Sequence, residues 1–195
     1  NPFIKVTKIP NGVNLNEFTI LKKKTNNFFD LPRPIILNVS ALVSWKRQEL
    51  IIKAVSKLNK GSLVLVGRGE EGRRLMKLGN KLLPGRFKIL SFKHNEMSKI
   101  YTQADLFTFS TVPWESFGIV MLEAMACGLP VVATDDPIRR EIVGEAGLFV
   151  NPTNIEEYAK TLDKALGVNW GDKPRKQAEK FSWEIIAKKY EEVFA

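Results

Sequence analysis

The chain has 195 residues, of which 44% are hydrophobic and 26% are charged. This size and composition are typical of one soluble globular domain, and they exclude collagen-like, mucin-like and wholly disordered proteins. The single cysteine, Cys127, and the single histidine, His94, exclude an internal disulfide and a zinc site built from cysteine and histidine. The sequence has no apolar run close to the roughly 20 residues that cross a bilayer, and it begins without a basic and apolar leader. We therefore expect a cytoplasmic protein, and the missing first methionine suggests a fragment of a longer one.

Lysine and arginine residues outnumber acidic residues by 30 to 21, which gives a formal net charge of +9. This excess favours anionic partners, which include phosphorylated small molecules, the surface of an anionic membrane and nucleic acid. The basic residues are scattered between the predicted elements and are not interleaved with aromatic residues as in a single-strand-binding groove. We predict that most of them form a solvated surface, and a basic nucleic-acid-binding module remains an alternative.

Six short runs of apolar or β-branched residues are predicted to be strands. Most are continuous rather than alternating, as expected when helices cover both faces of a parallel sheet. In chain order the predicted strands are 35–39, 62–66, 87–90, 106–110, 131–134 and 148–150. A shorter run at 5–9 is a candidate for a further strand, and the polar stretch 22–34 is predicted to be a loop.

Segments with helical spacing of apolar residues lie between the predicted strands. In chain order they are 49–58, 71–83, 96–103, 117–127 and 155–166. After a predicted loop over 167–174, a last helix at 182–194 has an apolar stripe that needs a partner surface. The alternation predicts one α/β domain that is Rossmann-like, with a mainly parallel sheet and helices on both faces. In such sheets ligands bind at the carboxyl ends of the strands.

The segment 110–134 is predicted to run as strand, turn, helix, turn and strand. Its helix is apolar on almost every side, yet it includes Glu123, and a buried carboxylate needs a partner. Glu115 precedes the helix, followed by Ser116 and Gly118, so free backbone N–H groups and the positive end of the helix dipole are predicted to bind an anion. In a purely structural alternative, Glu115 caps the helix and Glu123 meets a buried amide or a lysine.

The same two glutamates are a poor match to the acid/base pair of a glycosidase. Eight helical residues would separate them by about 12 Å along the axis. Glycoside hydrolysis uses carboxyl groups roughly 5–9.5 Å apart. We therefore predict two separate contacts along one extended ligand.

A Gly-x-Gly-x-x-Gly pattern at 67–72 directly follows a predicted strand. It is typical of dinucleotide sites, but Glu70 and Glu71 would repel a pyrophosphate there, and no acidic residue ends the next strand. An oxidoreductase is therefore disfavoured, and we interpret the glycines as a tight turn that brings backbone close to a ligand. Lys46, in the loop after the first strand, is a candidate phosphate partner. The pair Asp135-Asp136 is interpreted as a turn and helix cap rather than a metal site.

Several segments, in this order and spacing, resemble the C-terminal domain of retaining, nucleotide-sugar-dependent glycosyltransferases of family 4 (group 1), which have the two-domain GT-B fold. The central match is to the family's Glu-x7-Glu signature, which runs from Glu115 to Glu123. The other matching segments are Ile-Pro-Asn-Gly-Val-Asn at 9–14, Val-Gly-Arg-Gly at 66–69, Tyr-Thr-Gln-Ala-Asp-Leu-Phe at 101–107, Glu-Ile-Val at 141–143 and Phe-Ser-Trp at 181–183.

The resemblance implies that the chain binds a nucleotide-sugar donor, and that the enzyme needs no metal or other cofactor. Glu115 would be the catalytic residue and would lie against hydroxyls of the donor sugar. Glu123 would hold the ribose hydroxyls, and Lys46 would neutralise the donor diphosphate. The other donor-binding residues that it implies are Arg47, Arg68, Phe92, Ser116, Phe117, Gly118 and Ile119.

The chain departs from the family pattern after the first strand. The family has Gly-Arg there, and its arginine joins the lysine on the diphosphate, whereas this chain has Ser40-Ala41. Arg47 and Arg68 are candidates to compensate, and a degenerate nucleotide-sugar-binding domain remains an alternative function.

GT-B enzymes build the acceptor site largely in an N-terminal domain, for which 195 residues leave no room. We therefore expect residues 1–195 to be the donor-binding half, inactive alone, with the helix 182–194 packed on the absent domain. Peripheral contact with the inner face of an anionic membrane is also implied by the resemblance.

Overall fold

The computed structural model of the chain describes residues 6–21, 28–115 and 117–194. At its centre is one sheet of six strands in the order β3-β2-β1-β4-β5-β6, in which all neighbours are parallel. The strands are β1 (Ile35–Val39), β2 (Ser62–Val66), β3 (Phe87–Leu90), β4 (Leu106–Phe109), β5 (Val131–Thr134) and β6 (Gly147–Val150). These confirm the six predicted strands. The candidate strand at 5–9 is wrong where the structure describes it, because residues 6–9 form no strand, and Lys5 lies outside the described residues.

Helices lie between these strands and after the last one. Where the sequence predicts a helix, its first and last residues lie within two residues of the predicted bounds. They are α1 (Gln48–Ser56), α2 (Gly72–Leu82), α3 (Met97–Tyr101), α4 (Ile119–Ala126), α5 (Pro137–Val143), α6 (Ile155–Gly167), α7 (Lys173–Glu179) and α8 (Trp183–Phe194). The sequence pattern does not predict α5 and α7, which are seven residues each and have a proline in their first turn. Proline is compatible with that position because the backbone N–H there has no partner within the helix.

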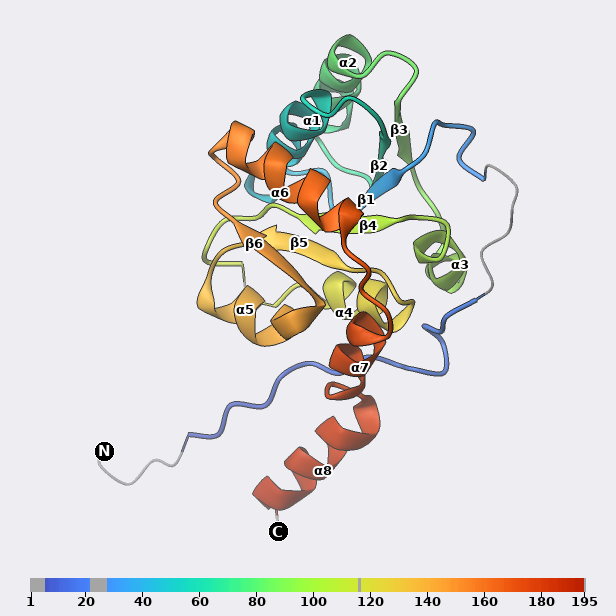
Figure 1. Ribbon diagram of the computed structural model, residues 1–195. Coiled ribbons are helices and arrows are strands. Elements are labelled where there is room, and N and C mark those ends of the chain that lie inside the picture. The colour runs from blue at the N-terminus through green and yellow to red at the C-terminus, as the bar shows by residue number, and fades with distance from the viewer. Residues whose placement is uncertain (1–5, 22–27, 116, 195) are drawn as a thin grey trace.

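The sheet is covered by helices on both faces (Figure 1). One face packs in a core with residues of α1, α2 and α6, and the other in a core with residues of α3, α4, α5 and α7. Successive residues of β1 show the alternation, since Ile36 belongs to the first core and Leu37 to the second. Because both faces are buried, the strands are continuous apolar runs, as the Rossmann-like prediction requires.

The chain changes direction across the sheet between β1 and β4. β1 pairs with β2 on one side and with β4 on the other, so strands added later in the chain extend the sheet outward both ways. The loops after β1 and β4 therefore separate at their carboxyl ends, which is where Rossmann-like sheets bind ligands.

The N-terminal segment around Val13 lies beside the junction of α7 and α8. Val13 pairs with Ser182 in an isolated parallel bridge, and the Val13 backbone N–H donates to the Phe181 carbonyl at 2.8 Å. The Trp183 ring lies over Gly12, where a Cβ atom would come within 2.7 Å of it. From there α8 extends away from the sheet (Figure 1) with Ile186 buried. None of the helices in the described part of the chain is both long and apolar enough to span a membrane.

Candidate functional site

Lys46 and Glu115 form an ion pair at the carboxyl ends of β1 and β4. Lys46 ends a short 3-10 turn after β1, and Glu115 lies in the loop between β4 and α4. The Lys46 ammonium donates to the Glu115 carboxylate at 2.6 Å, and each side chain is only 16% exposed. The structure therefore brings together two residues that the sequence singles out separately. It contradicts the alternative in which Glu115 caps α4, because the N-cap of that helix is Gly118.

Arg139, a fully buried arginine in α5, holds the loop that contains Glu115 in place. Its guanidinium donates to the Asp136 carboxylate at 2.8 Å and to the Glu115 carbonyl at 2.6 Å. Further hydrogen bonds run to the carbonyls of Val112 and Pro113 at 3.2 and 3.4 Å. Buried guanidinium groups need this many partners because desolvation of a charge is costly. Asp136 also accepts from the Arg139 backbone N–H at 3.0 Å, which confirms its predicted role as a helix cap.

The start of α4 lies next to the Lys46–Glu115 pair. The helix begins at Ile119, so the predicted start at Phe117 is wrong by two residues, and Phe117 packs near Phe181 instead. Gly118 has φ +83°, and a Cβ atom there would come within 3.1 Å of the Phe109 ring. The same ring lies 5.4 Å from the Lys46 ammonium. The N-terminus of α4, with its partial positive charge, and the Lys46 ammonium therefore both lie close to the Phe109 ring. Ser116 lies outside the described residues.

Glu123 is buried inside α4 and is 8% exposed. Its carboxylate accepts a hydrogen bond from the Tyr101 hydroxyl at 2.7 Å. The partner is thus neither the amide nor the lysine of the structural alternative. Burial raises the pKa of Glu123, and burial together with the neighbouring carboxylate raises the pKa of Tyr101. The second carboxylate oxygen has no hydrogen bond within the described part of the chain, so it is available to a ligand hydroxyl.

The glycines after β2 allow the loop after β2 to contact the loop after β1 closely. A Cβ atom at Gly67 would lie 2.0 Å from the Ser40 carbonyl oxygen, and one at Gly69 would lie 2.3 Å from that of Leu42. The Leu42 N–H also donates to the Arg68 carbonyl at 2.9 Å. The close neighbour of these glycines is therefore the loop after β1, and the interpretation that they bring backbone close to a ligand stays a prediction.

The remaining predicted donor residues line the same end of the sheet. Arg68 is exposed, and its Nε donates to the Ser91 hydroxyl at 2.8 Å, beside the half-buried Phe92 that follows β3. Arg47 is half-buried with φ +53°, and no hydrogen bond or ion pair of its guanidinium is found among the described residues. The Ser40-Ala41 pair is held by Gln48, whose amide donates to the Ser40 hydroxyl at 2.9 Å and to the Ala41 carbonyl at 2.7 Å.

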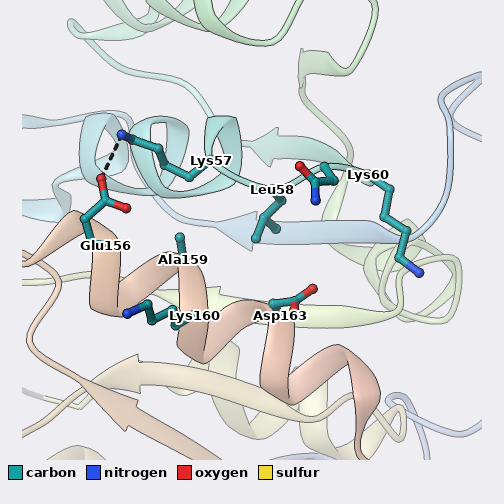
Figure 2. Close-up of a pocket in the computed structure, with 8 residues that line it drawn as sticks. Lys57, Leu58, Lys60, Glu156, Ala159, Lys160 and Asp163 are labelled. Carbon is teal, nitrogen blue, oxygen red and sulfur yellow. Dashed lines mark ion pairs between the residues drawn. The ribbon is translucent and has the colours of Figure 1, made fainter.

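A hollow lined by Lys57, Lys60 and Lys160 lies between α1 and α6 and has a volume of about 440 Å³ (Figure 2). Lys57 points toward Glu156 there, with 2.7 Å between ammonium and carboxylate, and Asp163 lies beside the same hollow. These carboxylates offset the lysines of the hollow, so an anion gains little. Lys60 lies two residues before the start of β2, which places the hollow toward the amino end of that strand and away from Lys46.

A parallel sheet with its change of direction between β1 and β4, and helices on both faces, defines a Rossmann-like domain. Residues 20–182 match the family model of glycosyl transferases group 1. The chain belongs to that family. The match includes the Lys46–Glu115 pair and Glu123.

Individual relatives are consistent with this membership. An uncharacterised glycosyltransferase of Methanocaldococcus jannaschii is 32% identical over 214 residues, which cover 99% of this chain and 54% of the relative. The solved sucrose-phosphate synthase of Thermosynechococcus elongatus has a TM-score of 0.81 at 28% identity, covering 95% of this chain and 51% of that one. Anabaena HepE, solved with UDP and glucose, has a TM-score of 0.84 at 24% identity over 95% of this chain and 56% of HepE, and shares the fold. The chain thus spans about half the length of these relatives, and the two solved structures among them are GT-B glycosyltransferases.

Proposed function

We propose that the chain is the donor-binding domain of a retaining glycosyltransferase of family 4, which transfers a sugar from a nucleoside diphosphate sugar to an acceptor. The observation that supports this most directly is the Lys46–Glu115 pair beside the start of α4. It combines a cation for phosphate with a carboxylate for sugar hydroxyls at the strand ends where this fold binds ligands.

The reaction needs positive charge where the nucleoside diphosphate leaves. Lys46 has two N–H donors besides the one directed at Glu115, and the N-terminus of α4 adds a partial positive charge. Such fixed positive groups stabilise charge that develops in the transition state. The proposal therefore includes no metal ion or other cofactor. Arg47 and Arg68 add charge in place of the arginine that Ala41 replaces.

The remaining proposed roles are assigned along an extended donor, from its sugar through its ribose to its base. Glu115 contacts the donor sugar and is the proposed catalytic residue, while the free oxygen of Glu123 accepts from the ribose. The backbone near Arg68 and Phe92 flanks the base. Further contacts come from the segment that leads into α4, which comprises Ser116, Phe117, Gly118 and Ile119.

The acceptor site is proposed to lie mainly in a separate N-terminal domain, so that this chain alone binds the donor without efficient transfer. The apolar side chains that α8 exposes support a contact with that domain. They are Trp183, Ile185, Tyr190, Val193 and Phe194.

Calorimetric titration with UDP, GDP, ADP and their sugar conjugates tests the proposal. We expect saturable binding of one nucleotide series, weakened by both Lys46→Ala and Glu123→Ala. The matched control is Lys160→Ala, which removes a lysine from the hollow between α1 and α6 and leaves binding unchanged. If the folded chain binds no nucleotide, the degenerate domain replaces this proposal. Salt-sensitive binding of arbitrary oligonucleotides without competition by nucleotide sugars would instead favour the nucleic-acid-binding module.

A cytoplasmic location with contact to an anionic membrane is a second part of the proposal. Arg73, Lys77 and Lys81 lie at intervals of four residues on exposed positions of α2, and no ion pair of theirs is found among the described residues. Their charges suit a surface of anionic lipid. Sedimentation with vesicles that contain phosphatidylglycerol, compared with phosphatidylcholine alone, tests this contact. Loss of the sedimented fraction in a variant with all three residues changed to glutamine is the expected result.

A further inference from the structure

Two exposed tryptophans flank the candidate catalytic carboxylate. Trp45 immediately precedes Lys46 and Trp114 immediately precedes Glu115, and these tryptophans are 49% and 79% exposed. Together with Val112 and Glu115 they line a pocket of about 510 Å³. Large aromatic side chains usually bury most of their surface, so two of them beside one carboxylate point to a ligand.

Backbone hydrogen bonds hold the segments that contain both tryptophans in place. The Trp45 carbonyl accepts from the Val112 N–H at 3.3 Å and from the Thr111 hydroxyl at 3.4 Å. Arg139 fixes the carbonyls on both sides of Trp114. Within the described part of the chain, neither indole has a ring contact or a hydrogen-bond partner for its N–H. Two indole faces and two N–H donors are therefore available to a ligand.

The chemistry of the pocket selects the ligand class. The indole faces favour an apolar surface, while the Glu115 carboxylate accepts hydrogen bonds and the indole N–H groups donate them. Lys46 already balances the Glu115 charge, so the pocket has no need of a cation. A sugar ring offers an apolar C–H face with hydroxyl groups around its edge, and it fits these requirements better than an amine or a phosphate.

We propose that Trp45 and Trp114 bind a sugar ring of the acceptor, so that the acceptor is a saccharide. This inference rests on the proposed transferase function, which places the donor against Lys46, Glu115 and Glu123. The pocket shares only Glu115 with that set. A sugar ring in this pocket would contact the catalytic carboxylate together with residues that are not among the proposed donor contacts, as expected for an acceptor sugar.

The test is 19F NMR of the chain labelled with 5-fluorotryptophan, because the sequence has only four tryptophans. The signals are assigned by single changes to phenylalanine. Methyl glycosides of glucose, mannose and N-acetylglucosamine, and maltose, are titrated with and without saturating UDP or GDP, and the UDP and GDP sugars are titrated separately. We expect at least one glycoside to shift the Trp45 and Trp114 signals saturably. Trp170, whose N–H is bonded to the Ala165 carbonyl, and Trp183, which packs on Gly12, serve as internal references that stay fixed.

Substitutions sharpen the result. Trp114→Ala should weaken glycoside binding by about tenfold, through loss of an aromatic contact, whereas Trp114→Phe should retain most of it. Phe194→Ala is the control, because Phe194 is 84% exposed on α8 and far along the chain from the pocket. If no glycoside moves either signal, the subsite is overturned. If only nucleotide sugars move them, the ring belongs to the donor and the acceptor assignment is overturned.

Calorimetry with UDP and GDP on the same samples separates this inference from the proposed function. Nucleotide binding without any glycoside shift overturns the subsite and leaves the donor-binding function standing. Glycoside shifts without nucleotide binding overturn the donor-binding function, and with it the assignment of the ring to an acceptor.

Discussion

Lys46 and Glu115 are 69 residues apart in the chain, and their side chains meet at 2.6 Å. Each comes from a loop after a strand next to the change of direction in the sheet, so the pair joins the two halves of the sheet where the ligand is proposed to bind. The pair is expected to stabilise the fold as well as to bind the donor, and these two contributions are separable.

A double-mutant cycle with Lys46→Met and Glu115→Gln measures the pair. Each single change leaves a half-buried partner uncompensated and should lower the free energy of unfolding by about 1–3 kcal/mol. The double change should cost less than the sum of the two, by about 0.5 kcal/mol or more. Urea unfolding of the four proteins gives these values. Additive effects would mean that the two side chains are not coupled.

Arg139→Leu is expected to be among the most damaging single changes in the chain. It leaves the Asp136 carboxylate buried without its cation and removes the hydrogen bonds to three carbonyls. The free energy of unfolding should fall by about 3–5 kcal/mol, measured by urea unfolding. The neighbouring Arg140→Ala is the control, because Arg140 pairs with Asp135 on the surface and its loss should lower stability far less. Equal effects of the two changes would contradict the buried network.

Glu123→Gln should change stability in a pH-dependent way. Burial raises the pKa of Glu123 in the folded protein, so its contribution to stability is present below the unfolded pKa and is lost as pH rises through the folded pKa. Glutamine stays neutral and its carbonyl still accepts from Tyr101. The variant should therefore gain stability relative to wild type as pH rises toward 8, while nucleotide binding weakens.

Urea unfolding of both proteins between pH 5 and pH 8 checks this trend, with Glu156→Gln as the opposite case. Lys57 lowers the pKa of the surface carboxyl of Glu156, so Glu156 contributes stability above its unfolded pKa and loses it as pH falls. That variant should be slightly less stable than wild type at neutral pH. A difference between Glu123→Gln and wild type that stays constant with pH would refute the predicted burial effect.

Gly67→Ala should disrupt the contact between the loops after β1 and β2. The added methyl would lie 2.0 Å from the Ser40 carbonyl oxygen, which is backbone and has no room to move independently. We expect a loss of about 2–4 kcal/mol or failure to fold, measured by circular dichroism and urea unfolding. Gly167→Ala is the matched control, because a methyl there meets nothing within 4 Å at the end of α6. A Gly67→Ala protein as stable as the control would show that the loops separate at little cost.

The sequence predicts the strands well because each fully buried strand is a short continuous apolar run, such as β2 with all five residues buried. It predicts Lys46, Glu115 and Glu123 from their residue types next to strand ends and in an apolar helix. It does not predict Arg139, whose partners Val112 and Glu115 are 27 and 24 residues away. A buried arginine and a solvated one look alike in sequence, and an aspartate three residues before Arg139 is the only local signal.

The same limitation applies to Trp45, Trp114 and Tyr101. Trp45 and Trp114 each precede a residue of the site, but only the folded chain shows that they line one pocket. Tyr101 is 22 residues from Glu123, and its hydroxyl reaches that carboxylate because α3 packs against α4. Contacts between segments distant in the chain thus account for what the residue pattern leaves out.

Cys127, the only cysteine, is buried immediately after α4, and burial raises the pKa of its thiol to about 12. At neutral pH it is therefore almost entirely protonated and unreactive toward maleimides and disulfide reagents. We therefore expect that a cysteine introduced on the surface can be labelled selectively without removing the natural one. The rate at which Cys127 itself reacts then reports how often the packing around α4 opens transiently. The proposed donor contacts depend on this helix.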